Sequence, residues 1–486
     1  MQLSELARIL PGATSRGDPA TVVRDAAADS RVVVPGSMFL CVPGERSDGH
    51  DFAADAVARG AAVLVVERWL DLDIPQLKVS SVRPAMGVLS ASVFGHPSRA
   101  MSVVGVTGTN GKTTSTFMLE KSFEAMGLTA GLIGTVEVHI AGDVFPVVHT
   151  TPEAPELQRL LARMRDRGVG AVAMEVSSHG LALGRVDGTR FACALFTNLT
   201  RDHLDFHPTM EDYEEAKSLL FAEGLSQRGA VNADDVVGRR LLERASIPLT
   251  SFSMTSEDAD VRAVGIATTR TGSTFTCVAG GERTAIEVRI AGRFNVGNAL
   301  GVLAVFRALE LPLEAAATGI GALTGVPGRM ESIEAGQPFT VLVDYAHTPD
   351  SLANVLRAAR EVCEGSLLVV FGCGGDRDRG KRPLMGRTAV ELADVAIITS
   401  DNPRSEDPLA IVAEIEAGAR EAGHSYQIEP DRRAAIRLAV ERARTNDVVV
   451  IAGKGHEPGQ RFADRVLPFD DRSVAREELG RFEAGR

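Results

Sequence analysis

Short apolar runs recur along the chain, and most are followed by a polar, often glycine-rich loop. Amphipathic stretches with helical spacing lie between the runs, which is typical of α/β domains built on mainly parallel sheets. Ligands of open parallel sheets bind beyond the carboxyl ends of the strands, so we expect functional residues in the loops that follow. The runs lie at residues 61–66, 101–106, 171–176, 191–196, 340–345, 367–371, 395–399 and 448–452.

The chain is too long for one ordinary core, and with 44% hydrophobic residues it is too apolar to be disordered. Three domains fit the pattern best, with limits at 1–98, 99–329 and 330–486. The first domain closes at a Gly-His-Pro-Ser linker, residues 95–98, and the third begins after Pro-Gly-Arg at 327–329. The third domain has the strand-and-loop order of a Rossmann-like α/β domain.

Composition and charge exclude several classes of protein. The N-terminus has no basic segment followed by an apolar one, and no stretch approaches the roughly 18 apolar residues of a membrane span. We therefore predict a soluble cytoplasmic protein with no membrane partner. The five cysteines form no C-x-x-C pair, so we expect reduced, mostly buried thiols. A net charge of -12 argues against a nucleic-acid partner.

A phosphate-binding loop is predicted between the run at 101–106 and a helix-like stretch that ends near Gly127. Backbone N–H groups and a helix N-terminus wrap a phosphate in this arrangement, with Lys112 at the β/γ-phosphates and Thr113 on Mg²⁺. Val106 replaces the usual first glycine, so the loop is a variant, and an ordinary turn is the alternative. We expect a central P-loop ATPase domain with parallel strands. Its candidate nucleotide contacts are Gly108, Thr109, Asn110, Gly111, Lys112, Thr113 and Thr114.

Two further loops after apolar runs are rich in acids and histidines. Glu175 ends one run, and the loop after another carries Asp202, His203, Asp205 and His207. Oxygen-rich sets with an occasional imidazole suit Mg²⁺ that is bound together with phosphates. The spacing of the two histidines also fits zinc, but no third or fourth soft ligand lies nearby. For His207 a capping or core role is an equal alternative.

These loops belong to a series of blocks that resembles the Mur ligase family, and within it the members that add diaminopimelate. The series covers about residues 29–457, and the ordered set is far more specific than any single block. The resemblance implies an N-terminal domain for a UDP-sugar, a central ATPase domain and a C-terminal domain for the incoming amino acid. The blocks are GTNGKTT, EVSSH, NLTRDHLD, YEEAKSLLF, GRFNVGNAL, GRME, DYAHTPDSL, GCGGDRDRGKRPLMG, SDNPR and AGKGHE.

The resemblance implies ATP-dependent addition of meso-2,6-diaminopimelate to the D-Glu of UDP-MurNAc-L-Ala-D-Glu, a step of peptidoglycan precursor synthesis. A carboxylate is a poor acyl donor, so it first attacks the γ-phosphate of ATP, and the amine then opens the acyl phosphate. Both steps bring anions together, which calls for two Mg²⁺ and fixed cations. The implied partners are these small molecules, and we expect a monomer.

The family's motifs also imply which residues contact the nucleotide and the metal. A helix cap or an interdomain ion pair is the alternative for each of the four further nucleotide contacts, which are Asn295, Arg329, Asp344 and His347. The implied catalytic and metal residues are Lys112, Thr113, Glu175 and His203, and the further nucleotide contacts are Asn295, Arg329, Asp344 and, less securely, His347.

Contacts to the UDP-sugar follow from the same resemblance. Some members of the family have amide side chains at the positions of His149 and Leu183, which leaves those two contacts unassigned here. The implied UDP-sugar residues are Ser30, Glu45, Arg46, Ser47, Thr150, Thr151, Ser177 and Arg185.

Lys217 lies in a stretch, Tyr-Glu-Glu-Ala-Lys, that reads as an amphipathic helix with a solvated lysine. The matching lysine of the family is carbamylated by CO₂, which turns a cation into an anionic oxygen ligand for the second Mg²⁺. Only a neutral amine reacts with CO₂, so a lowered lysine pKa or trapping by metal is required. The resemblance therefore implies that Lys217 is N6-carboxylysine.

The loop of Asp401, Asn402, Pro403 and Arg404 has the form that goes with meso-diaminopimelate in the family, in place of L-lysine. The planar guanidinium of Arg404 can take a carboxylate in a bidentate pair, and lysine lacks the distal carboxylate. The implied pocket also contains Arg377, Gly453 and Glu457. An ordinary turn, with Arg404 paired to Glu406 or Asp407, is the alternative.

Two other functions compete with this interpretation. One is another member of the superfamily, adding alanine, glutamate or D-Ala-D-Ala, or a folate polyglutamate ligase; the SDNPR and AGKGHE loops argue against it. The other is a regulatory P-loop ATPase without ligase chemistry, which needs no third α/β domain and would release phosphate without an amino acid.

Overall fold

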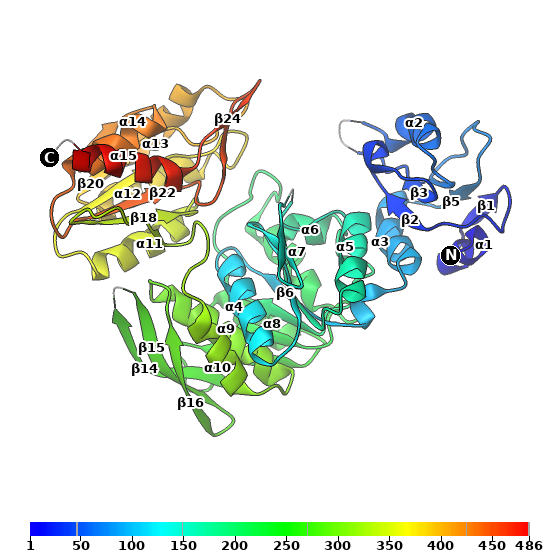
Figure 1. Ribbon diagram of the computed structural model, residues 1–486, viewed down its shortest axis with the longest axis horizontal. Coiled ribbons are helices and arrows are strands. Elements are labelled where there is room, and N and C mark those ends of the chain that lie inside the picture. Colours follow the sequence, from blue (N-terminus) through cyan, green and yellow to red (C-terminus); the bar gives the residue numbers. More distant parts are fainter. Residues whose placement is uncertain (45–46, 148, 270, 424, 485–486) are drawn as a thin grey trace.

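The computed structural model describes residues 1–44, 47–147, 149–269, 271–423 and 425–484. The chain forms three α/β domains, each with its own sheet, and the central domain lies between the other two (Figure 1). The predicted fold class is confirmed, whereas the limits 1–98, 99–329 and 330–486 stay predictions. Among the described residues, no helix is long and apolar enough to span a membrane.

The N-terminal domain is drawn in blue in Figure 1. Its strands are β1 (Thr14–Arg16), β2 (Asp25–Ala27), β3 (Ser37–Leu40), β4 (Val63–Val66) and β5 (Gln76–Lys78). Its helices are α1 (Leu3–Ile9), α2 (Ala53–Ala58) and α3 (Val82–Val93), with 3₁₀-helices η1 (Ser30–Val32) and η2 (Gly49–Phe52). The sheet order is β1-β5-β4-β3-β2, with β1 antiparallel to β5 and the other pairs parallel. All residues of β3 and β4 are buried, as expected for parallel strands covered on both faces.

The predicted linker at 95–98 connects the first two domains but is itself packed. It leads into the 3₁₀-helix η3 (Pro97–Arg99), where Pro97 and Ser98 are buried. The Ser98 hydroxyl accepts a hydrogen bond from the backbone N–H of Arg190, in the central domain, at 3.0 Å. The chain is therefore anchored where it enters the central domain.

The central domain has an extended mixed sheet. Its strands are β6 (Ser102–Thr107), β7 (Ala130–Ile133), β8 (Val138–Ile140), β9 (Asp143–Phe145), β10 (Ala171–Glu175), β11 (Cys193–Phe196), β12 (Gly229–Asn232), β13 (Leu249–Ser253), β14 (Val261–Thr269), β15 (Gly272–Ala279) and β16 (Glu282–Val288). Its helices are α4 (Lys112–Ala125), α5 (Ala154–Asp166), α6 (Ser178–Ala182), α7 (Met210–Ser218), η4 (Leu219–Phe221), α8 (Val236–Arg244), α9 (Phe294–Ala308) and α10 (Leu313–Ala322). The sheet order is β16-β15-β14-β13-β12-β11-β6-β10-β7-β8-β9.

The middle of this sheet, from β13 to β7, is parallel, as the apolar runs predict. Residues of each strand alternate between two cores, because successive side chains point to opposite faces. Val104 and Val106 pack with α4, α9 and α10, whereas Val103 and Val172 pack with α5, α6 and α8. Antiparallel strands extend both edges, β14 to β16 on one side and β8 with β9 on the other.

The C-terminal domain is a doubly covered, mainly parallel sheet, as the Rossmann-like pattern predicts. Its strands are β17 (Glu331–Ser332), β18 (Thr340–Asp344), β19 (Leu367–Phe371), β20 (Val395–Ile398), β21 (Tyr426–Ile428) and β22 (Val448–Ala452), with a hairpin of β23 (Gly459–Arg461) and β24 (Val466–Pro468). Its helices are α11 (Pro349–Glu361), α12 (Lys381–Leu392), α13 (Pro408–Ala422), α14 (Arg432–Arg442) and α15 (Asp471–Ala484). The order is β17-β18-β22-β19-β20-β21; α11 to α13 cover one face, and α14 and α15 the other.

A fully buried ion pair joins α14 to α15. Arg432 Nη2 lies 2.6 Å from Asp471 Oδ2, and Arg432 also donates to the Ala452 carbonyl oxygen at 3.0 Å, beside the predicted amino-acid loops. Asp471→Asn should lower the free energy of unfolding by about 3–5 kcal/mol, because a buried guanidinium loses its counter-charge. Urea denaturation measures this. Asp464→Asn, at an exposed pair with Arg465, should cost about 0.5 kcal/mol or less, and equal losses would contradict the role of the buried pair.

Candidate active site

A cleft of about 480 Å³ lies between the central and C-terminal domains, at the carboxyl ends of their strands. The structure places there most residues predicted for the nucleotide and the metal, and half of those predicted for the UDP-sugar. A volume of this size holds a small-molecule ligand. The predicted residues that line the cleft are Thr109, Asn110, Gly111, Lys112, Thr113, Thr114, Thr150, Thr151, Glu175, Ser177, Arg185, Asp202, His203, Lys217, Asn295, Arg329, Asp344, His347 and Arg377. His149, whose contact is unassigned, lines it as well.

The predicted phosphate loop connects β6 to α4. Gly108 has φ +146°, and a Cβ there would lie 1.9 Å from the Thr197 hydroxyl, so only glycine fits. Lys112 is folded back, its Nζ donating to the carbonyl oxygens of Gly108 and Thr109 at 2.8 and 2.9 Å. Burial holds the pKa of Lys112 below its usual range. The loop thus has a desolvated ammonium beside the N-terminus of a helix, a favourable place for phosphate.

Glu175 ends β10 and is fully buried. Its Oε1 accepts a hydrogen bond from the backbone N–H of Thr135 at 2.8 Å, and its Oε2 accepts one from the Thr135 hydroxyl at 2.9 Å. A Cβ at Gly134 would lie 2.7 Å from the same carboxylate. The Gly134–Thr135 turn therefore fixes the direction in which Glu175 faces the cleft.

His203 follows β11 and has the unusual φ of +56°. Its Nε2 lies 3.4 Å from Asp202 Oδ2, and the Nε2 of His347, from the C-terminal domain, lies 3.3 Å from the same oxygen. Burial lowers the pKa of His203 to about 2, so its imidazole is neutral and able to bind a metal. His207 is buried and stacks on the Tyr213 ring, with centroids 5.1 Å apart, which agrees with the alternative core role.

Lys217 lies on α7 with only 1% of its surface exposed. Its Nζ donates to the Gly108 carbonyl oxygen at 2.8 Å and lies 4.6 Å from the centre of the Tyr213 ring. Burial, and next the charge of Lys112, hold the pKa of Lys217 well below its usual range. The alternative of a solvated lysine is therefore wrong, and a lowered pKa is what reaction with CO₂ requires.

The residues predicted at the domain junction make specific contacts. Arg329 Nη2 donates to the Thr113 hydroxyl at 2.9 Å, and its guanidinium lies 4.5 Å from the centre of the Tyr345 ring. Asp344 accepts hydrogen bonds from the backbone N–H groups of Met330 and Ala346, and burial raises its pKa. Asn295 Nδ2 donates to a backbone carbonyl oxygen at 2.8 Å. Arg329 thus brings a cation from the junction to the phosphate loop.

The UDP-sugar residues divide into two groups. Thr150, Thr151, Ser177 and Arg185 line the cleft, and the Thr151 hydroxyl accepts the Ser177 backbone N–H at 3.0 Å. Ser30, buried in η1, and Ser47, which is exposed, lie in the N-terminal domain and do not line the cleft. Glu45 and Arg46 lie outside the described residues.

The amino-acid loops at residues 401–404 and 453–457 follow β20 and β22, whereas Arg377 follows β19. Of the residues implied for the amino acid, Arg377 lines the cleft. Asn402 Nδ2 donates to Glu457 Oε2 at 2.7 Å, and the fully buried Lys454 donates to Asn402 Oδ1 at 3.0 Å. Asp401 is buried beside Gly453, where a Cβ would lie 2.7 Å from its Oδ2. The two loops are therefore joined by side chains. Pro403 lies between Asn402 and Arg404 and is buried.

Arg404 is half-buried, and its Nη1 donates to the Gly375 carbonyl oxygen at 2.6 Å. Glu406, one of the acids considered as its partner, pairs instead with Arg382 at 2.7 Å. Burial, and next the charge of Arg377, lower the pKa of Arg404. Both side chains approach Gly374, where a Cβ would lie 2.7 Å from Arg404 Nη1 and 3.8 Å from Arg377 Cγ, and two arginines at one place favour a bound anion.

Sequence comparison finds related families along most of the chain. The model of the Mur ligase family, catalytic domain, matches residues 26–94; that of the Mur ligase middle domain matches 106–306; and that of the Mur ligase, glutamate ligase domain, matches 328–455. A UDP-N-acetylmuramoyl-L-alanyl-D-glutamate--2,6-diaminopimelate ligase of Streptomyces avermitilis is 47% identical over 98% of this chain and 96% of its own. This chain belongs to the Mur ligase family. A protein of the same name from Geobacillus kaustophilus is 46% identical over 98% of this chain and 99% of its own.

A solved structure of a protein with that name resembles this Mur ligase as a whole. Its TM-score is 0.70 at 33% sequence identity, and the match covers 99% of both chains. The similarity therefore includes all three domains.

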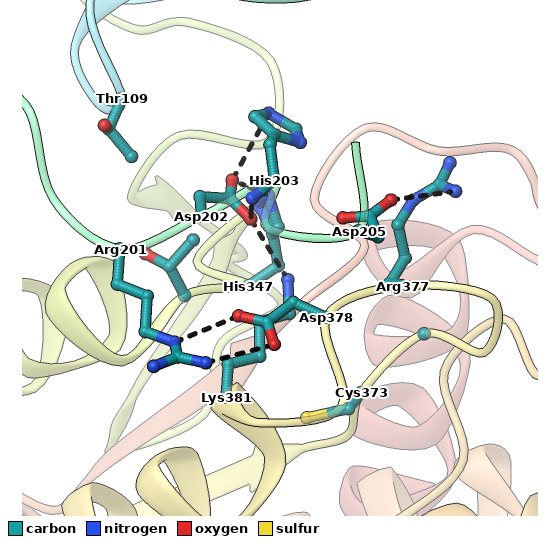
Figure 2. Close-up of polar contacts among 12 residues, drawn as sticks. Thr109, Arg201, Asp202, His203, Asp205, His347, Cys373, Arg377, Asp378 and Lys381 are labelled. Carbon is teal, nitrogen blue, oxygen red and sulfur yellow. Dashed lines mark hydrogen bonds and ion pairs between the residues drawn. The ribbon is translucent and has the colours of Figure 1, made fainter. Parts of the chain in front are cut away.

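Charged pairs that the motifs do not reveal join the central and C-terminal domains of this Mur ligase. Arg201 Nε lies 3.0 Å from Asp378 Oδ2, and the buried Lys381 lies 3.4 Å from Asp202 Oδ1 (Figure 2). Arg377 lies 3.9 Å from Asp205 across the same boundary. Lys381 lies within the GCGGDRDRGKRPLMG block, which is the one signal the sequence offers for it.

Proposed function

We propose that this Mur ligase adds meso-2,6-diaminopimelate to the D-Glu of UDP-MurNAc-L-Ala-D-Glu with ATP, in cytoplasmic peptidoglycan precursor synthesis. The observation that carries the proposal is the shared cleft. It brings the phosphate loop together with Thr151, Ser177 and Arg185, which are among the residues implied for the UDP-sugar substrate. The two relatives with this activity in their names, 47% and 46% identical over nearly the whole chain, support the same conclusion. We further propose that the enzyme acts as a monomer.

The reaction needs two steps whose atoms balance. A carboxylate oxygen of D-Glu attacks the γ-phosphorus, ADP leaves, and an acyl phosphate forms. The amine of diaminopimelate then attacks the acyl carbon, phosphate leaves with the former carboxylate oxygen, and the amine loses a proton. Lys112 and Arg329 are positioned to offset the charge that gathers at the phosphates, since both contact the phosphate loop.

The residues around the cleft fit magnesium. Thr113, Glu175, His203 and Lys217 all line it, and a carbamate on Lys217 would add an oxygen donor next to a neutral imidazole. Bound Mg²⁺ would screen the repulsion between the anionic substrates. Among the described residues, no three His, Cys, Asp or Glu side chains form a metal cluster on their own.

An isotope experiment tests the acyl phosphate. If the D-Glu carboxylate of the substrate contains the heavy oxygen isotope, one labelled oxygen should appear in the released phosphate for each amide formed. Mass spectrometry of the phosphate measures the transfer. Product formation with unlabelled phosphate would contradict the proposed route.

Arg404 should select meso-diaminopimelate over lysine. Lysine lacks the distal carboxylate, so a desolvated guanidinium would lose its partner, and discrimination on the order of 10³ or more in kcat/KM is expected. Arg404→Ala should lose most activity with diaminopimelate, whereas the already poor use of lysine should fall much less or rise. Steady-state kinetics with both amino acids measure this.

Arg465→Ala is the matched control, because Arg465 is exposed and lies in the nearby β23–β24 hairpin. It should leave both activities unchanged. If the natural enzyme used both amino acids equally well, or Arg404→Ala lowered both equally, Arg404 would be a structural residue and the substrate assignment would be wrong.

A further inference from the structure

Glu153 lies between two arginines that come from different domains. It is the N-terminal cap residue of α5 in the central domain. Its Oε2 is 2.9 Å from Nη1 of Arg83, on α3 of the N-terminal domain, and its Oε1 is 2.9 Å from Nε of Arg185. One carboxylate therefore bridges the N-terminal domain to a residue that lines the cleft.

The Arg185 side chain is held on the side facing the cleft. Its Nη1 donates to the Thr151 carbonyl oxygen at 3.1 Å, and 17% of the side chain is exposed. The Nε–H is buried and does not point along a hydrogen-bonding direction toward Glu153, so this contact is an ion pair without a hydrogen bond. The Arg185 guanidinium is therefore held by two contacts, the Thr151 carbonyl oxygen at Nη1 and the Glu153 carboxylate at Nε.

The N-terminal and central domains are in close backbone contact at this junction. A Cβ on Gly87 of α3 would lie 2.3 Å from the Asp187 carbonyl oxygen, and one on Gly188 would lie 2.5 Å from the Gly87 carbonyl oxygen. Asp187 and Gly188 follow Arg185 closely in the chain. A shift of α3 would therefore move both the loop that contains Arg185 and the Arg83 partner of Glu153, because close-packed backbones transmit displacement.

We propose that Glu153 is a positioning residue: it orients Arg185 toward the UDP-linked substrate and makes that orientation depend on the docked N-terminal domain through Arg83. The inference rests on the proposed function, in which one substrate spans the N-terminal domain and the cleft. Binding of the nucleotide end of this substrate to the N-terminal domain would then fix the orientation of Arg185, which meets the other end of the substrate.

A second contact at the same interface provides the control. Arg159, also on α5, donates to Asp25 Oδ1 at 2.6 and 3.1 Å and to the Ala26 carbonyl oxygen at 2.6 Å, both in the N-terminal domain. It fastens the two domains, and its hydrogen bonds go to Asp25 and Ala26 and not to Arg185. If Glu153 only fastened the domains, loss of Arg159 would have the same effect as loss of Glu153.

The test measures KM for UDP-MurNAc-L-Ala-D-Glu, ATP and diaminopimelate in Glu153→Gln, Arg83→Met, Arg159→Met and the Glu153→Gln/Arg83→Met double variant. Glu153→Gln should raise KM for the UDP-linked substrate about tenfold and leave KM for ATP unchanged, because a misplaced contact weakens the binding of one substrate. Arg83→Met alone should raise KM for the UDP-linked substrate about threefold. In the double variant it should add nothing to the effect of Glu153→Gln. Arg159→Met should leave the ratio of KM for the UDP-linked substrate to KM for ATP unchanged.

Several results would overturn the proposal: an equal effect of Arg159→Met, a parallel rise of KM for ATP, or additive effects in the double variant. If Glu153→Gln failed to fold, a comparison of KM for the UDP-linked substrate between Arg83→Met and Arg159→Met would still test the proposal, since both variants change side chains at the domain surface. Failure of the proposed function is a different result, because the natural enzyme would then form no product. Calorimetric binding of UDP-MurNAc-L-Ala-D-Glu would repeat the comparison without turnover.

Discussion

Lys112→Ala is expected to abolish ligation, with kcat/KM lower by a factor on the order of 10³ or more, while the fold stays intact. The Lys112 ammonium lies against the predicted phosphate loop, and water cannot replace its charge. The fold should survive because the hydrogen bonds of Lys112 go to the carbonyl oxygens of Gly108 and Thr109, which water can reach when the side chain is removed. Product formation and thermal melting measure the two effects.

Lys121→Ala is the matched control for this variant. Lys121 lies on the same helix, α4, and its exposed side chain pairs with Glu124 at 2.6 Å. We expect full activity from it. Retained ATP-dependent product formation in Lys112→Ala would remove the assignment of the phosphate loop.

Lys217→Ala should lower activity by about 10² or more, and short carboxylates such as formate or acetate should restore part of it. In the proposed active form the neutral amine attacks CO₂ and loses a proton, leaving an anionic carbamate whose oxygen would bind metal. Burial of the amine and the nearby charge of Lys112 favour the neutral amine that this reaction needs. A free carboxylate can enter the space left by alanine and supply the same kind of oxygen.

Lys112→Ala is the control for the rescue, because a carboxylate cannot replace a cation, and its activity should not return. A structure at high resolution provides a second readout, since the carbamate should be visible on Nζ. Full activity of the natural enzyme in buffer freed of CO₂, with no carbamate in the structure, would contradict the role given to Lys217.

The sequence predicts the parallel core of the fold because buried strands are continuous apolar runs. The runs at 101–106 and 448–452, for example, become β6 and β22. The antiparallel edges escape this argument: β14 alternates half-buried with exposed residues over much of its length, so it has no apolar run. Patterns of apolar residues thus identify the centre of a sheet better than its edges.

The site is predictable where the chemistry lies within one loop, as in Gly108–Thr114. The parts of the site that depend on contacts between domains are not predictable from the sequence. Asn110 donates to Asp350 at 3.0 Å, and Lys381 lies near Asp202, but each pair is far apart in the sequence and has no local signature. The burial of Lys217 is a similar case, because the helix pattern around it predicts exposure and tertiary packing reverses it.

The most direct test of the account is release of ADP and phosphate by the purified protein with ATP and UDP-MurNAc-L-Ala-D-Glu, assayed with meso-diaminopimelate, with lysine or with neither. Sustained release and a UDP-linked tripeptide are expected with diaminopimelate alone, because the acyl phosphate needs its amine. Equal release without any amino acid would indicate a regulatory ATPase, and equal product with lysine would contradict the substrate; either result would overturn the central claim.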